Sequence, residues 1–155
     1  DNLHLTLRFL GDTTSEQREQ IEAALSALAA SFPPFDLAVQ KLGAFPNLRK
    51  PNIVWLGFGG DLQTLGGQQR QIEAAAQAAG FPAEERAFAA HLTIARAQKS
   101  AASSDLSCAG ELLRIEAAAL TAATVFRVEQ IYLIRSDLRA SGPIYRPLAV
   151  VDLAG

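Results

Sequence analysis

The sequence is poor in cysteine and carries no strong excess of charge of either sign. Its single cysteine, Cys108, cannot form an internal disulfide, which suits a reducing cytosol, and we expect it to be a buried small apolar residue. The net charge of −2 argues against a protein that coats long nucleic acid, which would need a basic field. Recognition of one phosphate or one nucleic-acid end stays open.

Several segments that would indicate other functions are also missing. No apolar run reaches the length of about 18–20 residues needed to span a bilayer, and there is no signal peptide, so we expect no membrane partner and a cytoplasmic protein. Neither G-x-x-x-x-G-K-[ST] nor G-x-G-x-x-G occurs, so no nucleotide triphosphate or dinucleotide is indicated. Two histidines without a nearby cluster of Asp, Glu or Cys make a poor metal site. We therefore expect no cofactor.

The composition is that of an ordinary globular domain. The 155 residues are 49% hydrophobic and 19% charged, which provides enough apolar mass for a core and fits a single domain over 1–155. Because the chain starts at Asp1 and a strand is expected almost at once, we expect the numbering to begin inside a longer protein or at a trimmed end.

The stretch NLHLTLRFLG, residues 2–11, alternates apolar and polar residues and predicts a strand. One side of this strand is apolar, and the other side carries an imidazole, a hydroxyl and a guanidinium from His4, Thr6 and Arg8. The apolar side is formed by Leu3, Leu5, Leu7 and Phe9.

Periodicity and chain breakers predict the remaining elements. Helices are expected at residues 14–30 (with a Thr13–Glu16 capping box and a stop at Pro33-Pro34), 62–79 (stopped by Gly80) and 105–116. Strands are expected at residues 35–42, 53–58, 90–97, 125–136 (as one strand or two) and 144–153, with a loop at 42–52, a turn at 137–143 and an edge or bulge at Pro147. Strands mixed with helices without regular βαβ alternation indicate an α+β fold with mainly antiparallel sheet.

A short motif occurs twice. His-Leu-Thr-Leu at 4–7 recurs as His-Leu-Thr-Ile at 91–94, and each copy opens a unit of strand, helix and further strands. With seven threonines in the chain, chance would place a threonine two residues after both histidines in roughly one of five hundred such sequences. We therefore expect two pseudo-symmetric lobes whose sheets line a central cleft, with helices outside, and a shared active site.

The repeated motif suits phosphoester chemistry. Residues i and i+2 of a strand project to the same face, so each motif offers an imidazole beside a hydroxyl. Displacement at phosphorus places the attacking and leaving oxygens roughly in line, so two histidines on opposite sides of a phosphate would act as base and acid. Threonine hydroxyls would donate hydrogen bonds to the non-bridging oxygens.

Paired H-x-T motifs about 80–90 residues apart resemble those of the 2H phosphoesterase superfamily. NLHLTLRFLG, LGAFPNLRKPNIVWLGF, ERAFAAHLTIARA and IYLIRSDLRASGPIYRPLA are similar to its RNA 2′,3′-cyclic phosphodiesterases, also called 2′-5′ RNA ligases. The resemblance covers nearly the whole chain. Ala90 stands where the family usually has proline. The family also has a strand and a helix before the first motif, and we expect this chain to lack them.

The resemblance implies roles for individual residues. The catalytic pairs fall on His4 with Thr6 and on His91 with Thr93, with His4 as general acid and His91 as general base, and a phosphate-contacting arginine falls on Arg96. Simple alternation aims Arg96 away from His91, so this role requires a bulge or a strand end there. From its own position, Phe45 in the expected loop is either a base-stacking residue or a buried loop anchor.

The implied activity is hydrolysis of an RNA-terminal ribose 2′,3′-cyclic phosphate to a 2′-phosphate, with RNA ends or nucleoside 2′,3′-cyclic phosphates as partners of a monomer. One alternative is ATP-independent joining or cleavage of a 2′-5′ linkage, which is the same transesterification with RNA as nucleophile. Another is a non-catalytic module that binds RNA ends or nucleotides. Pure binding does not need two titratable imidazoles, which favours the enzyme.

Overall fold

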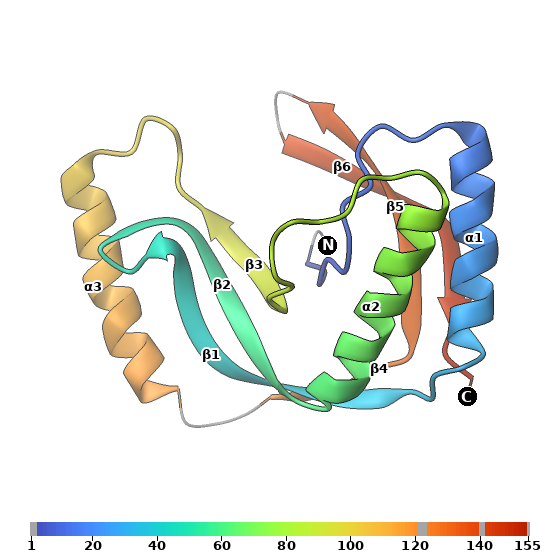
Figure 1. Cartoon of the computed structure of the whole chain (residues 1–155). Helices are drawn as coiled ribbons and strands as arrows, with labels where there is room; N and C mark the ends of the chain where they lie inside the picture. The colour runs from blue at the N-terminus through green and yellow to red at the C-terminus, as the bar shows by residue number, and fades with distance from the viewer. Residues whose placement is uncertain (1–2, 121–123, 140–141, 155) are drawn as a thin grey trace.

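A computed structural model describes residues 3–120, 124–139 and 142–154 of the chain. Figure 1 shows the arrangement of its helices and strands. The described elements are α1 (Ser15–Ala29), β1 (Phe35–Asn47), β2 (Lys50–Gly60), α2 (Leu62–Ala78), β3 (His91–Arg96), α3 (Ser103–Ala119), β4 (Val125–Val128), β5 (Gln130–Arg139) and β6 (Gly142–Asp152).

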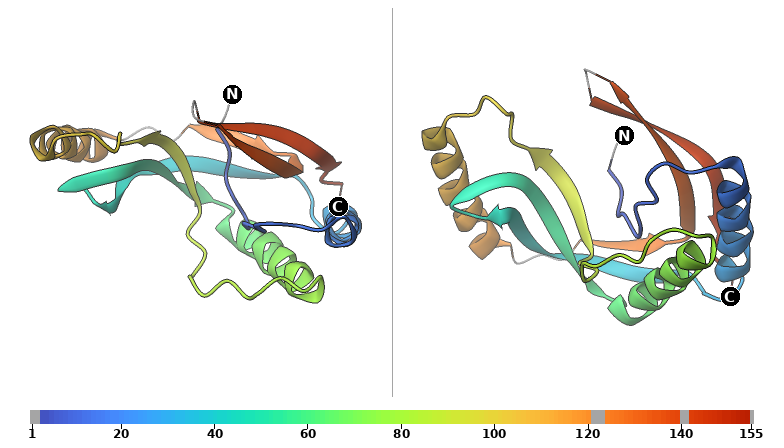
Figure 2. Two further views of the ribbon diagram at one scale, coloured as in Figure 1. Left: turned by 90° about the horizontal axis from the view of Figure 1, so that it is seen from above. Right: turned by 45° about the horizontal axis from the view of Figure 1, so that its top comes forward.

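Two antiparallel sheets form the body of the protein. Strands β3, β2, β1 and β4 pair in that order in a four-stranded sheet, and β5 pairs with β6 in a two-stranded sheet. The chain passes from one sheet to the other at Glu129, between β4 and β5. The four-stranded sheet is strongly curved, with α3 beside one end and α2 and α1 toward the other (Figures 1 and 2). The predicted α+β fold with antiparallel sheets is confirmed.

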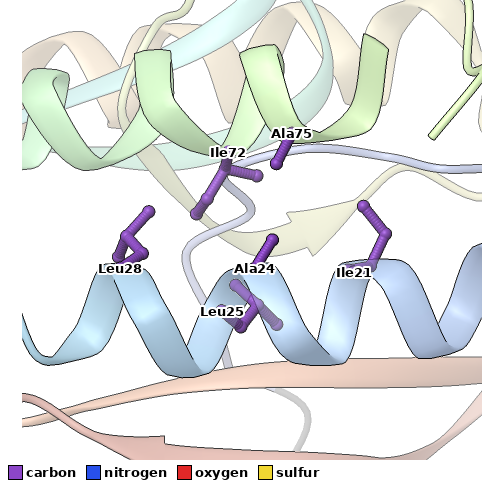
Figure 3. A pocket seen from close by; sticks show the side chains of 6 residues that line it. All are labelled: Ile21, Ala24, Leu25, Leu28, Ile72 and Ala75. Atoms are coloured by element: carbon purple, nitrogen blue, oxygen red, sulfur yellow. The ribbon is translucent and has the colours of Figure 1, made fainter. Parts of the chain in front are cut away.

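The main core lies where α1, α2, the start of β1 and the β5–β6 sheet meet. Its buried members are Ile21, Leu25, Leu28, Ala29, Phe35, Leu37, Leu65, Ile72, Ala76, Phe81, Ile131 and Leu153. A small apolar pocket between α1 and α2 is lined by Ile21, Ala24, Leu25, Leu28, Ile72 and Ala75 (Figure 3). Since none of these side chains is polar, we interpret this pocket as a packing defect between the two helices.

Helix α1 confirms the helix predicted at 14–30, but its cap lies one residue later than predicted. Thr14 is the N-cap, and its side chain and that of Gln17 form the reciprocal hydrogen bonds of a capping box. Thr13 instead donates its hydroxyl hydrogen bond to the Gly11 carbonyl, 3.1 Å away. Gly11 has a φ of 75°, a left-handed conformation that glycine adopts without strain, and this turn shifts the helix start.

The predicted loop at 42–52 is wrong, because β1 and β2 continue through it as a hairpin. They remain paired as far as Asn47 and Lys50. The Asn47 side chain accepts hydrogen bonds from the backbone N–H groups of Arg49 and Lys50, which closes the turn. Helix α3 approaches this turn so closely that a Cβ on Gly110 would lie 1.8 Å from the Leu48 carbonyl oxygen.

The predicted strand at 2–11 is also wrong: among residues 3–10 only Leu5 makes a β-bridge, to Leu92. Leu5 and Leu7 pack against the core, whereas Leu3 and Phe9 are 62% and 73% exposed, so the expected apolar face is broken. The cause is Arg8, which turns toward α2 and the residues after it. Its Nε lies 2.7 Å from a carboxylate oxygen of Glu73, and its guanidinium donates to the Phe9 and Pro82 carbonyls.

Other predictions have mixed outcomes. Cys108 is exposed and not buried, because α3 turns Leu106 and Gly110 toward the sheet. The helices expected at 62–79 and 105–116 and the strand at 90–97 are present as α2, α3 and β3, and residues 125–136 form two strands, β4 and β5. The turn expected at 137–143 is wrong where the structure describes it, since residues 137–139 of β5 pair with residues 142–144 of β6, and positions 140–141 lie outside the described residues.

Pro147 lies next to a bulge, as its position in the final strand predicted. Leu133 pairs with Ala149 and Ile134 pairs with Pro147, so Leu148 is the extra residue of β6. Within the described chain, β6 pairs only with β5, and an edge strand of this kind tolerates proline.

Candidate active site

The two His-x-Thr motifs meet at the Leu5–Leu92 bridge. In an antiparallel bridge, the residue before one partner faces the residue after the other, so the backbone places His4 beside Thr93 and Thr6 beside His91. Paired Cα atoms at such a bridge are roughly 4.5–5.5 Å apart. All four residues alternate with the bridged leucines, which puts them on the same face. Figure 1 shows the N-terminal segment running beside β3 at this point.

The same face continues across β3, β2 and β1 in three rows of paired residues. One row contains Lys41, Gly57 and His91, the next contains Gly43, Trp55 and Thr93, and the third contains Phe45, Ile53 and Arg96. Directly paired residues point to the same side of an antiparallel sheet, and the three β2 members alternate by two.

A β-bulge sets the direction of Arg96. Thr93 pairs with Trp55 and Ala95 pairs with Val54, so Ile94 is an extra residue of β3. The bulge shifts the alternation by one and returns Arg96 to the face of His91 and Thr93. The bulge that a phosphate-binding Arg96 requires is therefore present. Arg96 is exposed and makes no ion pair within the described part of the chain.

The imidazole of His91 is held in one orientation. Its Nδ1 lies 2.7 Å from the Ala89 carbonyl oxygen, and because a carbonyl only accepts, Nδ1 donates this hydrogen bond. In the neutral ring the proton is then on Nδ1, and Nε2 carries the lone pair. The Phe45 ring packs perpendicular to the imidazole, with centroids 5.3 Å apart. Phe45 lies on β1 and is 38% exposed, so it is neither in a loop nor buried.

Trp55 lies flat against the sheet beside Phe45. A Cβ built on Gly43 would approach three atoms of the Trp55 ring within 2.4–2.8 Å, so the absence of a side chain at Gly43 is what admits the indole. The Phe45 and Trp55 rings are 5.3 Å apart and tilted by 35°. Phe45, Trp55 and His91 therefore form a continuous aromatic surface.

His4 has an aromatic neighbour of its own. The Tyr145 ring on β6 lies 4.7 Å from the His4 ring at an interplanar angle of 74°. The motif of the first half thus contacts the β5–β6 hairpin of the second half, while the motif of the second half, on β3, pairs with the β1–β2 hairpin of the first. Each motif is therefore contacted by a hairpin of the other half.

The strands that carry this face hold more cations than carboxylates, although the net charge of the chain is −2. Strands β1, β2 and β3 hold the cations Lys41, Lys50 and Arg96 but a single carboxylate, Asp36, which pairs with Arg127 at 3.3 Å near the start of β1. No group of three or more His, Cys, Asp or Glu residues that could hold a metal ion occurs among the described residues. The arrangement suits an anion that meets imidazoles, hydroxyls and a guanidinium together.

Sequence reasoning did not identify Trp55, Tyr145 or Lys41. Trp55 is the only tryptophan and Tyr145 is one of two tyrosines, and this scarcity was the signal available. Their relation to the histidines depends on strand register and on contacts between the halves, neither of which local periodicity encodes.

No helix in the described ranges is long and apolar enough to cross a membrane.

Comparison with known proteins identifies relatives over nearly the whole chain. A family profile described as the 2′-5′ RNA ligase superfamily matches residues 1–140. An RNA 2′,3′-cyclic phosphodiesterase of Methanothermobacter thermautotrophicus is 32% identical over 154 residues, which cover 99% of this chain and 79% of that protein. A protein of the same name from Geobacillus stearothermophilus is 34% identical over 155 residues, covering 100% of this chain and 46% of that protein.

Solved structures share the fold. The crystal structure of TT0787 of Thermus thermophilus superimposes with a TM-score of 0.73 at 25% sequence identity, covering 97% of this chain and 78% of that chain. The crystal structure of E. coli LigT complexed with 3′-AMP gives a TM-score of 0.69 at 25% identity, covering 99% of this chain and 78% of that chain.

Proposed function

Because the chain belongs to the 2′-5′ RNA ligase superfamily, we propose that it hydrolyses an RNA-terminal ribose 2′,3′-cyclic phosphate and leaves a 2′-phosphate. The names of its relatives support the cyclic phosphodiesterase activity. The observation that carries the mechanism is the Leu5–Leu92 bridge, which sets the two His-x-Thr motifs side by side on one face. Both motifs come from one chain, so a monomer suffices for catalysis.

The reaction assigns opposite tasks to the two imidazoles. Water attacks phosphorus in line with the 3′ oxygen, a new P–O bond forms, and the bond from phosphorus to the 3′ oxygen breaks. Nε2 of His91 accepts the proton from water, since the Ala89 carbonyl keeps the proton of the neutral ring on Nδ1. His4 donates a proton to the departing 3′ oxygen, so the 2′ oxygen retains the phosphate.

Thr6, Thr93 and Arg96 stabilise the charge on the phosphate. The threonine hydroxyls share the face of the histidines and donate hydrogen bonds to the non-bridging oxygens. The Arg96 guanidinium, which the Ile94 bulge directs to this face, contacts the same oxygens. Phe45 packs on His91 and presents its exposed side to the nucleobase.

The assignment of acid and base is tested with a substrate whose 3′ bridging oxygen is replaced by sulfur. A thiolate leaves with little protonation, so His4→Ala loses little activity on this substrate relative to the wild type, whereas its activity on the oxygen substrate falls steeply. His91→Ala stays inactive on both substrates, because the water still needs a base. Rescue of His91→Ala alone would exchange the roles, and rescue of neither variant would refute the acid–base mechanism.

Joining or cleavage of a 2′-5′ linkage uses the same groups, and the name of the family supports it as the second candidate. In that reaction an RNA hydroxyl replaces water as the nucleophile at His91. Incubation of an RNA bearing a cyclic phosphate with an excess of a 5′-hydroxyl RNA separates the two activities, since joining gives a longer product without ATP.

A further inference from the structure

We propose that the aromatic surface of Phe45 and Trp55, together with Lys41, binds the last nucleotide of an RNA and the phosphodiester on its 5′ side. The enzyme would then prefer an oligonucleotide that ends in a cyclic phosphate over a nucleoside 2′,3′-cyclic phosphate. This inference rests on the proposed function, and it extends the site from the reacting phosphate to the chain that leads to it.

The direction of the chain follows from the chemistry of the substrate. A 2′,3′-cyclic phosphate occupies both the 2′ and the 3′ oxygen of the terminal ribose, so the RNA continues only through the 5′ oxygen. With the cyclic phosphate at His91, the base and the 5′ phosphate of that nucleotide must lie on surfaces next to His91. The face of β3, β2 and β1 offers an aromatic ring against His91 and a lysine in the same row as His91.

The base-binding part is the aromatic surface. Phe45 contacts His91 on one side and Trp55 on the other, and 38% of its surface is exposed. Single-stranded nucleic acids bind proteins by stacking bases on such rings, and this stacking tolerates any base. The Nε1 atom of Trp55 is buried and has no hydrogen-bond partner among the described residues, so the indole offers a ring and no polar group. We expect weak discrimination between bases here.

The phosphate-binding part is Lys41. It occupies the same row as His91, with Gly57 between them, and the Trp55 ring extends over Gly57, where an added Cβ would lie 3.0 Å from the ring. A Cβ on Gly57 would lie 3.2 Å from the Cβ of Lys41, which places both on this face. Neighbouring strands are about 4.8 Å apart, so Lys41 lies roughly 10 Å from β3.

Lys41 is also free to bind an anion. It is exposed and makes no ion pair within the described ranges. The carboxylate on these three strands, Asp36, is five residues away along β1 and pairs with Arg127. A second phosphate would therefore meet an ammonium group that forms no ion pair among the described residues.

The test compares kcat/KM for a nucleoside 2′,3′-cyclic phosphate and for a dinucleotide that ends in the same group. We expect the wild type to prefer the dinucleotide and Lys41→Ala to reduce this preference about 5- to 50-fold, the effect of one charge-assisted, partly exposed contact. Lys99→Ala, which removes an exposed lysine from the segment after β3, is the matched control and keeps the preference.

A binding measurement provides a readout that does not depend on turnover. Trp55 is the only tryptophan, so quenching of intrinsic fluorescence reports on this surface. We expect quenching by a dinucleotide with a terminal 2′-phosphate. The plot of log K against log salt should be shallower for Lys41→Ala than for the wild type by about 0.7. Phe45→Leu keeps an apolar side chain but loses the ring, and it should weaken binding about 5- to 150-fold.

The outcomes separate this inference from the proposed function. Equal preference and equal salt dependence in the wild type and Lys41→Ala would overturn the subsite, while hydrolysis of both substrates would leave the proposed function intact. Conversely, if neither cyclic phosphate is hydrolysed but Trp55 is quenched and the salt dependence changes, the subsite stands and the proposed hydrolysis is refuted.

Discussion

The bulge at Ile94 allows the role of Arg96 to be tested by moving one side chain by one position. The double variant Ala95→Arg/Arg96→Ala keeps the composition and charge of the chain. Ala95 pairs with Val54, whose side chain faces away from the row of Phe45, Ile53 and Arg96, so the guanidinium would move to the opposite face of the sheet.

The size of the effect follows from what this move removes. If Arg96 stabilises charge at the phosphate in the transition state, kcat should fall about 10²- to 10³-fold, corresponding to about 2.7–4 kcal/mol. The single variant Arg96→Lys should have a kcat between those of the double variant and the wild type, because an ammonium group cannot reproduce the two parallel hydrogen bonds of a guanidinium. The assay is steady-state hydrolysis of a nucleoside 2′,3′-cyclic phosphate, with urea unfolding to verify that each variant is folded.

Deletion of Ile94 is the control. The pairs Thr93–Trp55 and Arg96–Ile53 have two intervals on β2 and three on β3, so removing the extra residue restores a regular ladder with Arg96 on the same face. Ile94 is 43% exposed, and its loss leaves little cavity. We expect the deletion to retain activity within about tenfold of the wild type. Full activity in Ala95→Arg/Arg96→Ala, or equal losses of kcat in this variant and in the Ile94 deletion, would refute the role of Arg96 at the phosphate.

Three further predictions concern charge and stability. Thr6→Ala or Thr93→Ala should lower kcat about 10²- to 10³-fold, and losses below about threefold for both would mean that the hydroxyls point elsewhere. Hydrogen bonds from the Gln77 side chain and a backbone N–H, together with the Arg8 charge, hold the pKa of Glu73 below its ordinary value of 4.5. The unfolded chain therefore binds more protons, so the free energy of unfolding should decrease as the pH falls below 4.5, and Glu73→Gln should flatten this dependence in urea titrations. Excess EDTA without ATP should leave hydrolysis unchanged, because in the proposed mechanism two imidazoles supply the proton transfers, and loss of activity with recovery by an added divalent ion would contradict it.

Sequence periodicity predicted the elements whose stability is local. Helix α1 buries Ile21, Leu25 and Leu28 at helical spacing, and α2 ends where Gly80 adopts a φ of 88°. The prediction failed at the N-cap of α1, where the adjacent residues Thr13 and Thr14 offer the same side chain. The hydrogen bond from Thr13 to the Gly11 carbonyl decides between them, and it depends on a backbone turn that the pattern does not specify.

The segments around the site were predicted less well, because their conformation depends on distant partners. Residues 42–52 contain two prolines and a glycine, which favour a loop, yet antiparallel pairing and the contact of Gly110 with the turn keep them extended. Residues 3–10 alternate as a strand does, yet the ion pair of Arg8 with Glu73 bends them away after one bridge. In both segments nonlocal contacts override the local preference.

The repeat predicted that two histidines act together, but not how the halves support them. Each motif depends on a hairpin of the other half: β3 and His91 on β1–β2, and His4 on Tyr145 of β6. Neither half alone provides all the neighbours of its histidine, so the site forms only when both halves have folded. An arrangement of this kind keeps two nearly identical motifs in different surroundings, since a phenylalanine on β1 and a tyrosine on β6 are not equivalent neighbours. The hydrolysis proposed above uses that difference, because in it one imidazole accepts a proton while the other donates one.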